Sequence, residues 1–134
     1  MRVLPDTSIW SAALRRGNDV VASYGGELLK LVNQGLVEII GPIRQETLSG
    51  IRDRSKFEVV RDHLRTFPDL EIGTKEYEEA ASFYNQCRTN GIQGSFTDFV
   101  ICAVAVRYDL AIFTDDKDFL RYKTVLPIHL YAIR

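Results

Sequence analysis

The chain has little cysteine, little histidine and almost no net charge, and each shortage argues against a class of site or partner. Its two cysteines, Cys87 and Cys102, form no C-x-x-C pair and have no histidine nearby. This argues against a disulfide framework and against a zinc site. A formal net charge of −1 leaves no overall basic surface for nucleic acid. A polyanionic substrate would therefore have to be attracted by local cations and by bound metal.

Long hydrophobic runs are also missing. The longest apolar run, residues 99–106, is far too short to cross a membrane, and Pro5 and Asp6 come too early for a signal peptide. We therefore expect a cytoplasmic protein with no membrane contact. There are no internal repeats or linker-like stretches, and 134 residues suffice for one domain with a real core. The prediction is a single domain over residues 1–134.

What the sequence does contain is organised around residues 94–119. Ser95, followed three positions later by Asp98 and then by an apolar run, predicts the start of a helix. That helix should end near residue 107. Residues 110–113 are apolar without alternation, which is typical of a strand buried on both faces in a parallel sheet. Three acids follow this strand at once: Asp115, Asp116 and Asp118.

The rest of the chain alternates between short apolar segments and amphipathic helices. One helical pattern, residues 20–34, contains Gly25 and Gly26, which indicate a kink or a break. The alternation predicts an α/β fold: a three-layer α/β/α sandwich with a mostly parallel, five-stranded sheet and Rossmann-like topology. The expected strands lie at residues 3–5, 36–40, 70–72, 110–113 and 128–133, with helices in the intervals between them.

The acids of the chain gather where such a sheet would place a functional crevice. If the first three strands grow outward on one side and the last two on the other, the topology reverses between strands one and four. Singly, the acids have plainer interpretations, such as a helix cap or a solvated helix residue. Together, their carboxylates would need a counter-ion, and oxygen ligands without His or Cys suit Mg²⁺ or Mn²⁺. The acids concerned are Asp6, Glu46, Asp98 and the Asp115–Asp116 pair.

These segments resemble those of PIN-domain ribonucleases, specifically the VapC-type toxins. The resemblance covers essentially the whole chain and implies a PIN-like fold. It places the acidic quartet of the family on Asp6, Glu46, Asp98 and Asp116, with Asp118 as a further ligand or an outer acid. Asp115 occupies a variable position of the motif, and sequence alone does not separate it from Asp116. The similar segments are D-T-S at 6–8, G-P-I-R-Q-E-T-L-S-G at 41–50, G-S-F-T-D at 94–98 and T-D-D-K-D-F at 114–119.

The resemblance implies a metal-dependent endoribonuclease that is the toxin of a toxin–antitoxin pair. Asp6, Asp98 and Asp116 would hold Mg²⁺ or Mn²⁺, which activates water and neutralises phosphate charge. Glu46 or Asp118 would orient the water or complete a second metal site, so one ion and two ions both stay open. The implied partners are an RNA substrate, with tRNA among the candidates, a small antitoxin and a second copy of the chain. Apolar patches for such partners could come from Trp10, Tyr24, Phe83 and Tyr84.

Two further questions stay open. Basic residues between positions 44 and 65, among them Arg44, Arg52 and Arg54, either contact RNA phosphates or form the polar face of a mixed-charge helix. Two other classes of protein also compete. An aspartyl-phosphate receiver would need a lysine after the last strand, and residues 130–134 have none. A catalytically inert PIN-like module that only binds RNA or protein would be expected to have lost one of the acids, and none is missing.

Overall fold

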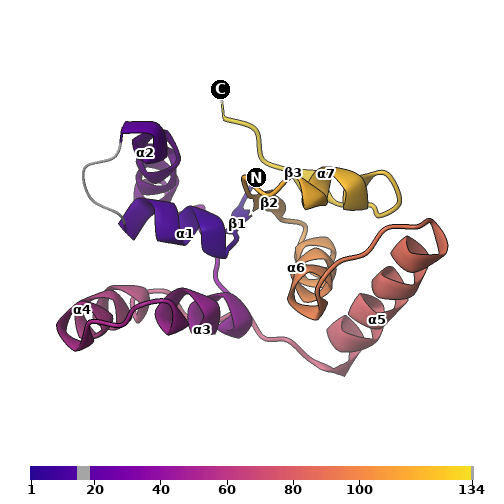
Figure 1. Ribbon diagram of the computed structural model, residues 1–134, viewed down its shortest axis with the longest axis horizontal. Helices are drawn as coiled ribbons and strands as arrows, with labels where there is room; N and C mark the ends of the chain where they lie inside the picture. Colours follow the sequence, from indigo (N-terminus) through magenta and orange to yellow (C-terminus); the bar gives the residue numbers. More distant parts are fainter. Residues whose placement is uncertain (15–18, 134) are drawn as a thin grey trace. The chain divides into compact units, whose positions relative to one another are not determined.

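The structure is a computed structural model that describes residues 1–14 and 19–133. The chain forms two compact units. Unit 1 comprises Met1–Leu4 and Glu71–Arg134, and unit 2 comprises Pro5–Leu70. Figure 1 follows the elements along the chain by colour. The organisation as a single domain stays a prediction.

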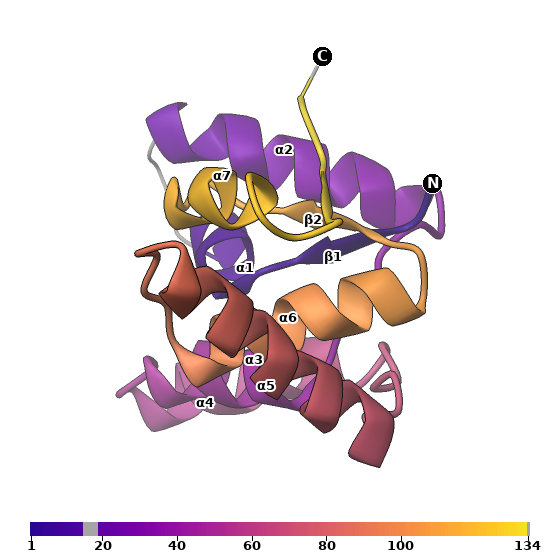
Figure 2. The ribbon, with the colours of Figure 1, turned by 90° about the vertical axis from the view of Figure 1, so that its right-hand side faces the viewer.

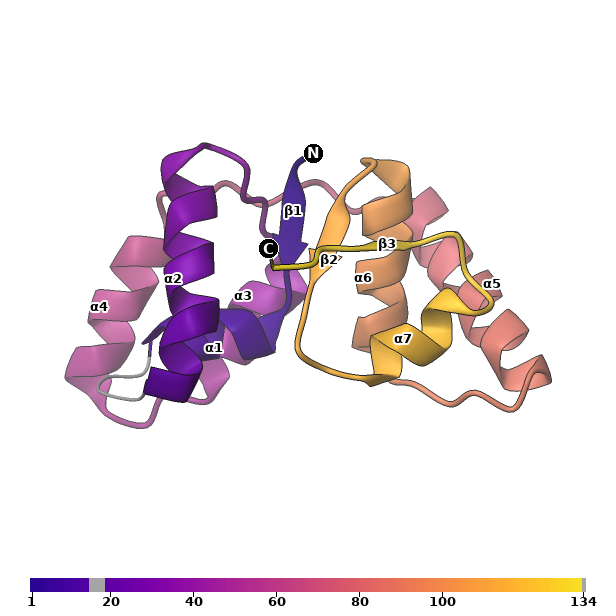
Figure 3. The ribbon, with the colours of Figure 1, turned by 90° about the horizontal axis from the view of Figure 1, so that it is seen from above.

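Unit 1 contains the sheet. Its strands β1 (Val3–Pro5), β2 (Ala111–Phe113) and β3 (His129–Leu130) stand in the order β1-β2-β3 (Figure 3). β2 pairs in parallel with β3, and the Ala111 amide donates a hydrogen bond to the carbonyl of Arg2 over 3.0 Å. Every residue of β2 is buried, as expected for a strand with no polar alternation. The first strand therefore neighbours the strand at 111–113, as the predicted topology requires.

Three helices complete unit 1: α5 (Thr74–Thr89), α6 (Phe96–Arg107) and α7 (Asp118–Lys123). α5 and α6 pack against each other (Figure 2). α6 begins as predicted, because the Ser95 hydroxyl accepts a hydrogen bond from the Asp98 amide over 3.1 Å. Both cysteines are buried free thiols, and burial raises the pKa of each. They act as small apolar core residues.

Unit 2 is helical in its described part. It consists of α1 (Thr7–Leu14), α2 (Asp19–Asn33), α3 (Gly41–Ser49) and α4 (Arg54–Leu64). α2 runs through Gly25 and Gly26 without a break, so the expected break is wrong, and the kink stays a prediction. A Cβ on Gly25 would lie 3.2 Å from the Cα of Ala13, so this glycine allows close approach of α1 and α2. Gly35, with φ of +71°, follows the helix in the left-handed conformation typical of a helix end.

The prediction of a five-stranded sheet is wrong, because the described residues contain three strands. Residues 36–40 and 70–72 do not form strands. Ile39 instead forms one isolated parallel bridge with Asp69, and the Leu70 amide donates a hydrogen bond to the Ile39 carbonyl over 2.9 Å. Directly after Ile40 the chain turns into α3, so the paired stretch cannot lengthen. The three-layer packing stays a prediction. Among the described residues, no helix is both long and apolar enough to cross a membrane.

Candidate metal centre

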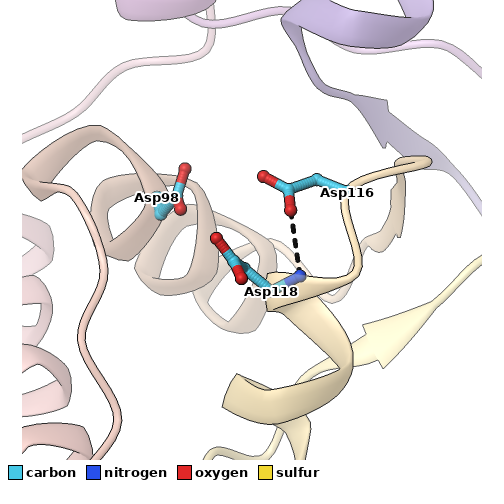
Figure 4. Close-up of side chains that lie close together, drawn as sticks. All are labelled: Asp98, Asp116 and Asp118. Carbon is cyan, nitrogen blue, oxygen red and sulfur yellow. Dashed lines mark hydrogen bonds between the residues drawn. The ribbon is translucent and has the colours of Figure 1, made fainter.

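Three of the predicted acids lie together in unit 1. One carboxylate oxygen each from Asp98, Asp116 and Asp118 falls within 4.8 Å of the other two (Figure 4). Like charges at this distance repel one another, and a divalent cation bound between them would relieve that repulsion. The donors are all carboxylate oxygens, the ligands that Mg²⁺ and Mn²⁺ prefer. The residues present therefore fit the metal that the sequence predicted.

Asp98 comes from the first turn of α6 and is the least exposed of the three acids. Its Oδ2 accepts a hydrogen bond from the Tyr122 hydroxyl over 2.6 Å. Burial raises the pKa of Asp98, the hydrogen bonds from Tyr122 and Ser95 lower it, and the charges of Asp116 and Asp118 raise it further. Burial prevails, so the pKa of Asp98 lies above its ordinary value. A bound cation would act in the opposite direction.

Asp116 comes from the turn between β2 and α7, and Asp118 is the first residue of α7. The Asp116 amide donates to the Thr114 hydroxyl, and the Asp118 amide donates to Oδ1 of Asp116, each over 2.9 Å. These bonds fix the direction of the Asp116 carboxylate at the start of α7. Both acids are exposed to solvent, so an ion could reach them. Asp115 is also exposed but lies outside the group of three, which favours Asp116 as the ligand.

Asp6 and Glu46 belong to unit 2. The Asp6 side chain is 6% exposed, and its Oδ1 accepts hydrogen bonds from the Ser8 hydroxyl over 2.5 Å and from the Ile9 amide over 3.3 Å. Asp6 therefore caps the N-terminus of α1, which is the structural role that an aspartate before a helix commonly has. The Thr7 hydroxyl donates to Oε1 of Glu46 over 2.7 Å, which ties the start of α1 to α3. The catalytic roles of Asp6 and Glu46 stay predictions.

Sequence reasoning missed two residues at this centre, Tyr122 and Gly94. Tyr122 is fully buried in α7 and reaches Asp98. Gly94 leaves room for the Tyr122 ring, because a Cβ there would lie 2.8 Å from its Cζ. One feature of the sequence could have pointed to Tyr122: Phe119 and Tyr122 are spaced so that they lie on one face of a short helix. A tyrosine on a buried face needs a hydrogen-bond partner, and the acids were the nearest candidates in the sequence.

The basic residues divide into structural and exposed ones. The Arg44 guanidinium donates to Asp69 through Nε over 3.0 Å and to the carbonyls of Leu64 and Phe67 over 2.9 and 2.5 Å. Arg44 therefore holds the chain that follows α4, and its predicted contact with RNA phosphate is not supported by these bonds. Arg54 pairs with Glu58 along α4 over 3.1 Å, which matches the mixed-charge helix. Arg52 is exposed.

Solved structures of other proteins share the fold. The structure of FitAcB from Neisseria gonorrhoeae has 19% sequence identity and a TM-score of 0.77, and the match covers 97% of this chain and 96% of that one. VapBC2 from Rickettsia felis, bound to a DNA fragment from its promoter, has 17% identity and a TM-score of 0.76 over 98% of both chains. FitAB bound to the IR36 DNA fragment has 18% identity and a TM-score of 0.72, over 96% of this chain and 93% of that one.

The comparisons of sequence point to one family. No curated protein matches the sequence significantly. The profile of the PIN domain, however, matches residues 3–125, nearly the whole chain and all the predicted acids. This match confirms the family that the sequence motifs indicated. The chain belongs to the PIN domain family.

Proposed function

We propose that the protein is a metal-dependent endoribonuclease that hydrolyses RNA phosphodiester bonds, and that it is the toxin of a VapBC-type pair. One observation carries the proposal: Asp98, Asp116 and Asp118 converge in a chain of the PIN domain family. The choice of RNA, with tRNA among the candidates, comes from the resemblance to VapC-type toxins, and the cytoplasm as its location is the expectation from the sequence.

The side chains divide the work as follows. Asp98, Asp116 and Asp118 would hold Mg²⁺ or Mn²⁺, and the resemblance to VapC-type toxins adds Asp6 as a further ligand. When bound, the ion supplies charge neutralisation for the phosphate and lowers the pKa of water. Glu46 or Asp118 would orient the attacking water or complete a second metal site. The scheme holds for one ion or two.

Cleavage of labelled RNA in Mg²⁺, Mn²⁺ and EDTA tests the proposal. Asp98→Asn and Asp116→Asn should each remove most of the activity, because each takes a charged ligand from the ion. Asp115→Asn is the matched control, since it makes the same change next to Asp116 but outside the group of three, and it should retain cleavage. Undiminished cleavage in EDTA would overturn the proposal. RNA binding without cleavage would favour the alternative, an inert PIN-like binding module.

A groove in unit 2 supports the small antitoxin as a partner. It has a volume of about 1000 Å³ and lies among α1, α2 and α4, with apolar walls that include Leu28 and Val60. Trp10 borders it and is 5% exposed, and among the described residues its indole N–H has no hydrogen-bond partner. We assign this groove to an apolar segment of the antitoxin.

Binding of the antitoxin is testable by calorimetry on the two purified proteins. Val59, which is 57% exposed and borders the groove, is the position to change. Val59→Glu should weaken binding at least tenfold, because it places a charge in an apolar contact. Val106→Glu makes the same change on an exposed valine of unit 1 and should have no effect. Equal affinities for the wild type and Val59→Glu would remove the groove from the proposal.

Exposed aromatic side chains support the homodimer. Phe96 and Tyr77 of unit 1 are 78% and 53% exposed, and they border a pocket of about 490 Å³ together with Tyr84. Aromatic residues are enriched in interfaces between subunits. Phe83, which the sequence had offered for this role, is 2% exposed and belongs to the core instead. Light scattering should report a dimer for the wild type and a monomer for Phe96→Ser, and a monomeric wild type would contradict the proposal.

A further inference from the structure

Tyr122 is a fully buried tyrosine whose hydroxyl meets a carboxylate of the candidate metal centre. It lies in α7, and its hydroxyl donates to Oδ2 of Asp98 over 2.6 Å, joining α7 to the first turn of α6. A buried tyrosine hydroxyl needs an acceptor, and backbone carbonyls are the most common ones in proteins. Here the acceptor is instead one of the three acids, a choice that packing alone does not explain.

The ring of Tyr122 is held on several sides. Its centroid lies 5.0 Å from that of Phe99 and 5.1 Å from that of Phe119, with interplanar angles of 47° and 75°. On another side the ring touches the backbone of Gly94. A Cβ on this residue would lie 2.8 Å from Cζ and 2.9 Å from Cε1, and closer still to the hydroxyl oxygen. Only glycine therefore permits the ring to occupy this place, and the hydroxyl has little freedom to move.

The hydroxyl is a donor that adds no charge. A lysine or arginine in the same place would also orient the carboxylate, but its positive charge would compete with a cation. A neutral donor fixes one oxygen of Asp98 and leaves the negative charge of the group available to an ion.

We propose that Tyr122 is the positioning residue of the metal centre, which holds the Asp98 carboxylate in the orientation that binds the ion, with Gly94 as the residue that makes room for it. This inference rests on the proposed metal-dependent function. The hydroxyl engages Oδ2, which limits rotation of the carboxylate and leaves Oδ1 for the ion. Ligand carboxylates that are fixed by such outer hydrogen bonds lose less freedom when the ion binds.

A purely structural tyrosine would behave differently, and the chain offers a matched control. The Tyr108 hydroxyl donates to the carbonyl of Glu71 over 2.7 Å. Tyr108 lies in the same unit at the other end of α6, away from the three acids. Tyr108→Phe and Tyr122→Phe therefore each remove one hydroxyl and one hydrogen bond from unit 1. Only Tyr122→Phe removes a bond to a proposed ligand.

The experiment measures Mn²⁺ affinity by calorimetry, and the metal-free melting temperature, for the wild type and both variants. Tyr122→Phe should weaken Mn²⁺ binding by about tenfold, the lower end of the usual effect of losing an outer hydrogen bond. Tyr108→Phe should leave the affinity unchanged. Gly94→Ala is an independent variant. Its Cβ would displace the ring, so it should also weaken Mn²⁺ binding while the Tyr122 hydroxyl is still present.

Three other outcomes would overturn the inference that Tyr122 positions the Asp98 carboxylate. An unchanged affinity in Tyr122→Phe, an equal loss in both tyrosine variants, or failure of Tyr122→Phe to fold would reduce Tyr122 to a structural role. These outcomes leave the proposed function intact as long as the wild type binds Mn²⁺. A wild type that binds no Mn²⁺ would overturn the proposed function, and the role of Tyr122 with it.

Discussion

Asp98 is partly buried and has two neighbouring carboxylates. These two features predict the direction in which the free energy of unfolding changes with pH. Its pKa is raised in the folded protein, so the folded state binds the proton more tightly than the unfolded state does. The free energy of unfolding therefore falls as pH rises through the raised pKa, and below the ordinary value of 3.8 the effect is absent. At neutral pH, without metal, the ionised Asp98 destabilises the fold.

Asp98→Asn should consequently raise the metal-free melting temperature at pH 7, and the gain should shrink as the pH is lowered toward 3.8. It should also reduce the stabilisation by Mg²⁺, because a ligand that binds the folded state stabilises it according to its affinity. Thermal melts in EDTA and in Mg²⁺ across this pH range provide the measurement. If the variant melts at a lower temperature without metal and responds to Mg²⁺ as the wild type does, Asp98 is only a favourable charge at a helix N-terminus.

The sequence allowed the acids to be predicted but not their supports. Asp98, Asp116 and Asp118 stand in recognisable motifs, so their convergence was expected, and it occurs. Tyr122 was not predicted as the partner of Asp98, because the two residues are 24 positions apart. Their contact depends on how α7 packs against α6, which no local pattern specifies. Local motifs point to the candidate ligands, whereas the residues that contact them follow from tertiary packing.

At the scale of elements, helices were predicted better than strands. Capping and apolar spacing are local signals, and α1 and α6 begin where these signals place them. Residues 36–40 have the composition of a strand but form only isolated bridges. A strand needs a partner over several residues, and the partner segment after α4 is held by the Arg44 side chain instead. Strand length is therefore decided by contacts distant in sequence.

The hydrogen bonds of Arg44 predict a structural effect. Arg44→Met keeps the apolar stem but removes the guanidinium, which leaves the Leu64 and Phe67 carbonyls and the Asp69 carboxylate without their donor. The free energy of unfolding should fall by roughly 2 kcal/mol, the order of a hydrogen bond to a charged group. Arg52→Met, at an exposed site, should change it by less than about 0.5 kcal/mol. Urea denaturation of both variants measures the difference, and equal stabilities would contradict the structural role.

The two glycines of α2 should respond differently to alanine. A Cβ on Gly26 would meet no atom of the described residues within 4 Å, so Gly26→Ala should stabilise the protein by about 0.5–1 kcal/mol through helix propensity. On Gly25, the same Cβ would lie 3.2 Å from a backbone atom of α1, and the crowding should cancel that gain. Chemical denaturation would compare the two variants. A larger gain for Gly25→Ala would show that α1 does not pack there.

At the scale of the whole molecule, the alternation of elements was enough to predict the α/β class and the neighbours in the sheet. The first strand and the strand at 111–113 are adjacent, although more than a hundred residues separate them. This pairing follows from general rules on parallel sheets and crossovers. The number of strands could not be predicted from the alternation of elements, because it depends on how far the pairing extends at each edge of the sheet.

The predicted single domain has a direct calorimetric test. Both compact units belong to a chain of domain size, and β1 contributes residues to each of them. We expect one cooperative unfolding transition, with calorimetric and van't Hoff enthalpies that agree. Arg44→Met in unit 2 and Tyr108→Phe in unit 1 should then lower the same melting temperature. Two transitions, each shifted by only one of these variants, would mean that the units are separate domains.

The most direct test of the metal centre is anomalous diffraction from crystals of the protein grown in Mn²⁺. The three converging carboxylates predict a Mn²⁺ peak at direct coordination distance from oxygens of Asp98 and Asp116, with Asp118 as a third ligand or one water molecule away. The peak should disappear in Asp98→Asn crystals prepared in the same way. A wild-type crystal with its only Mn²⁺ peak elsewhere, or with none, would contradict the assignment of these acids as the metal centre.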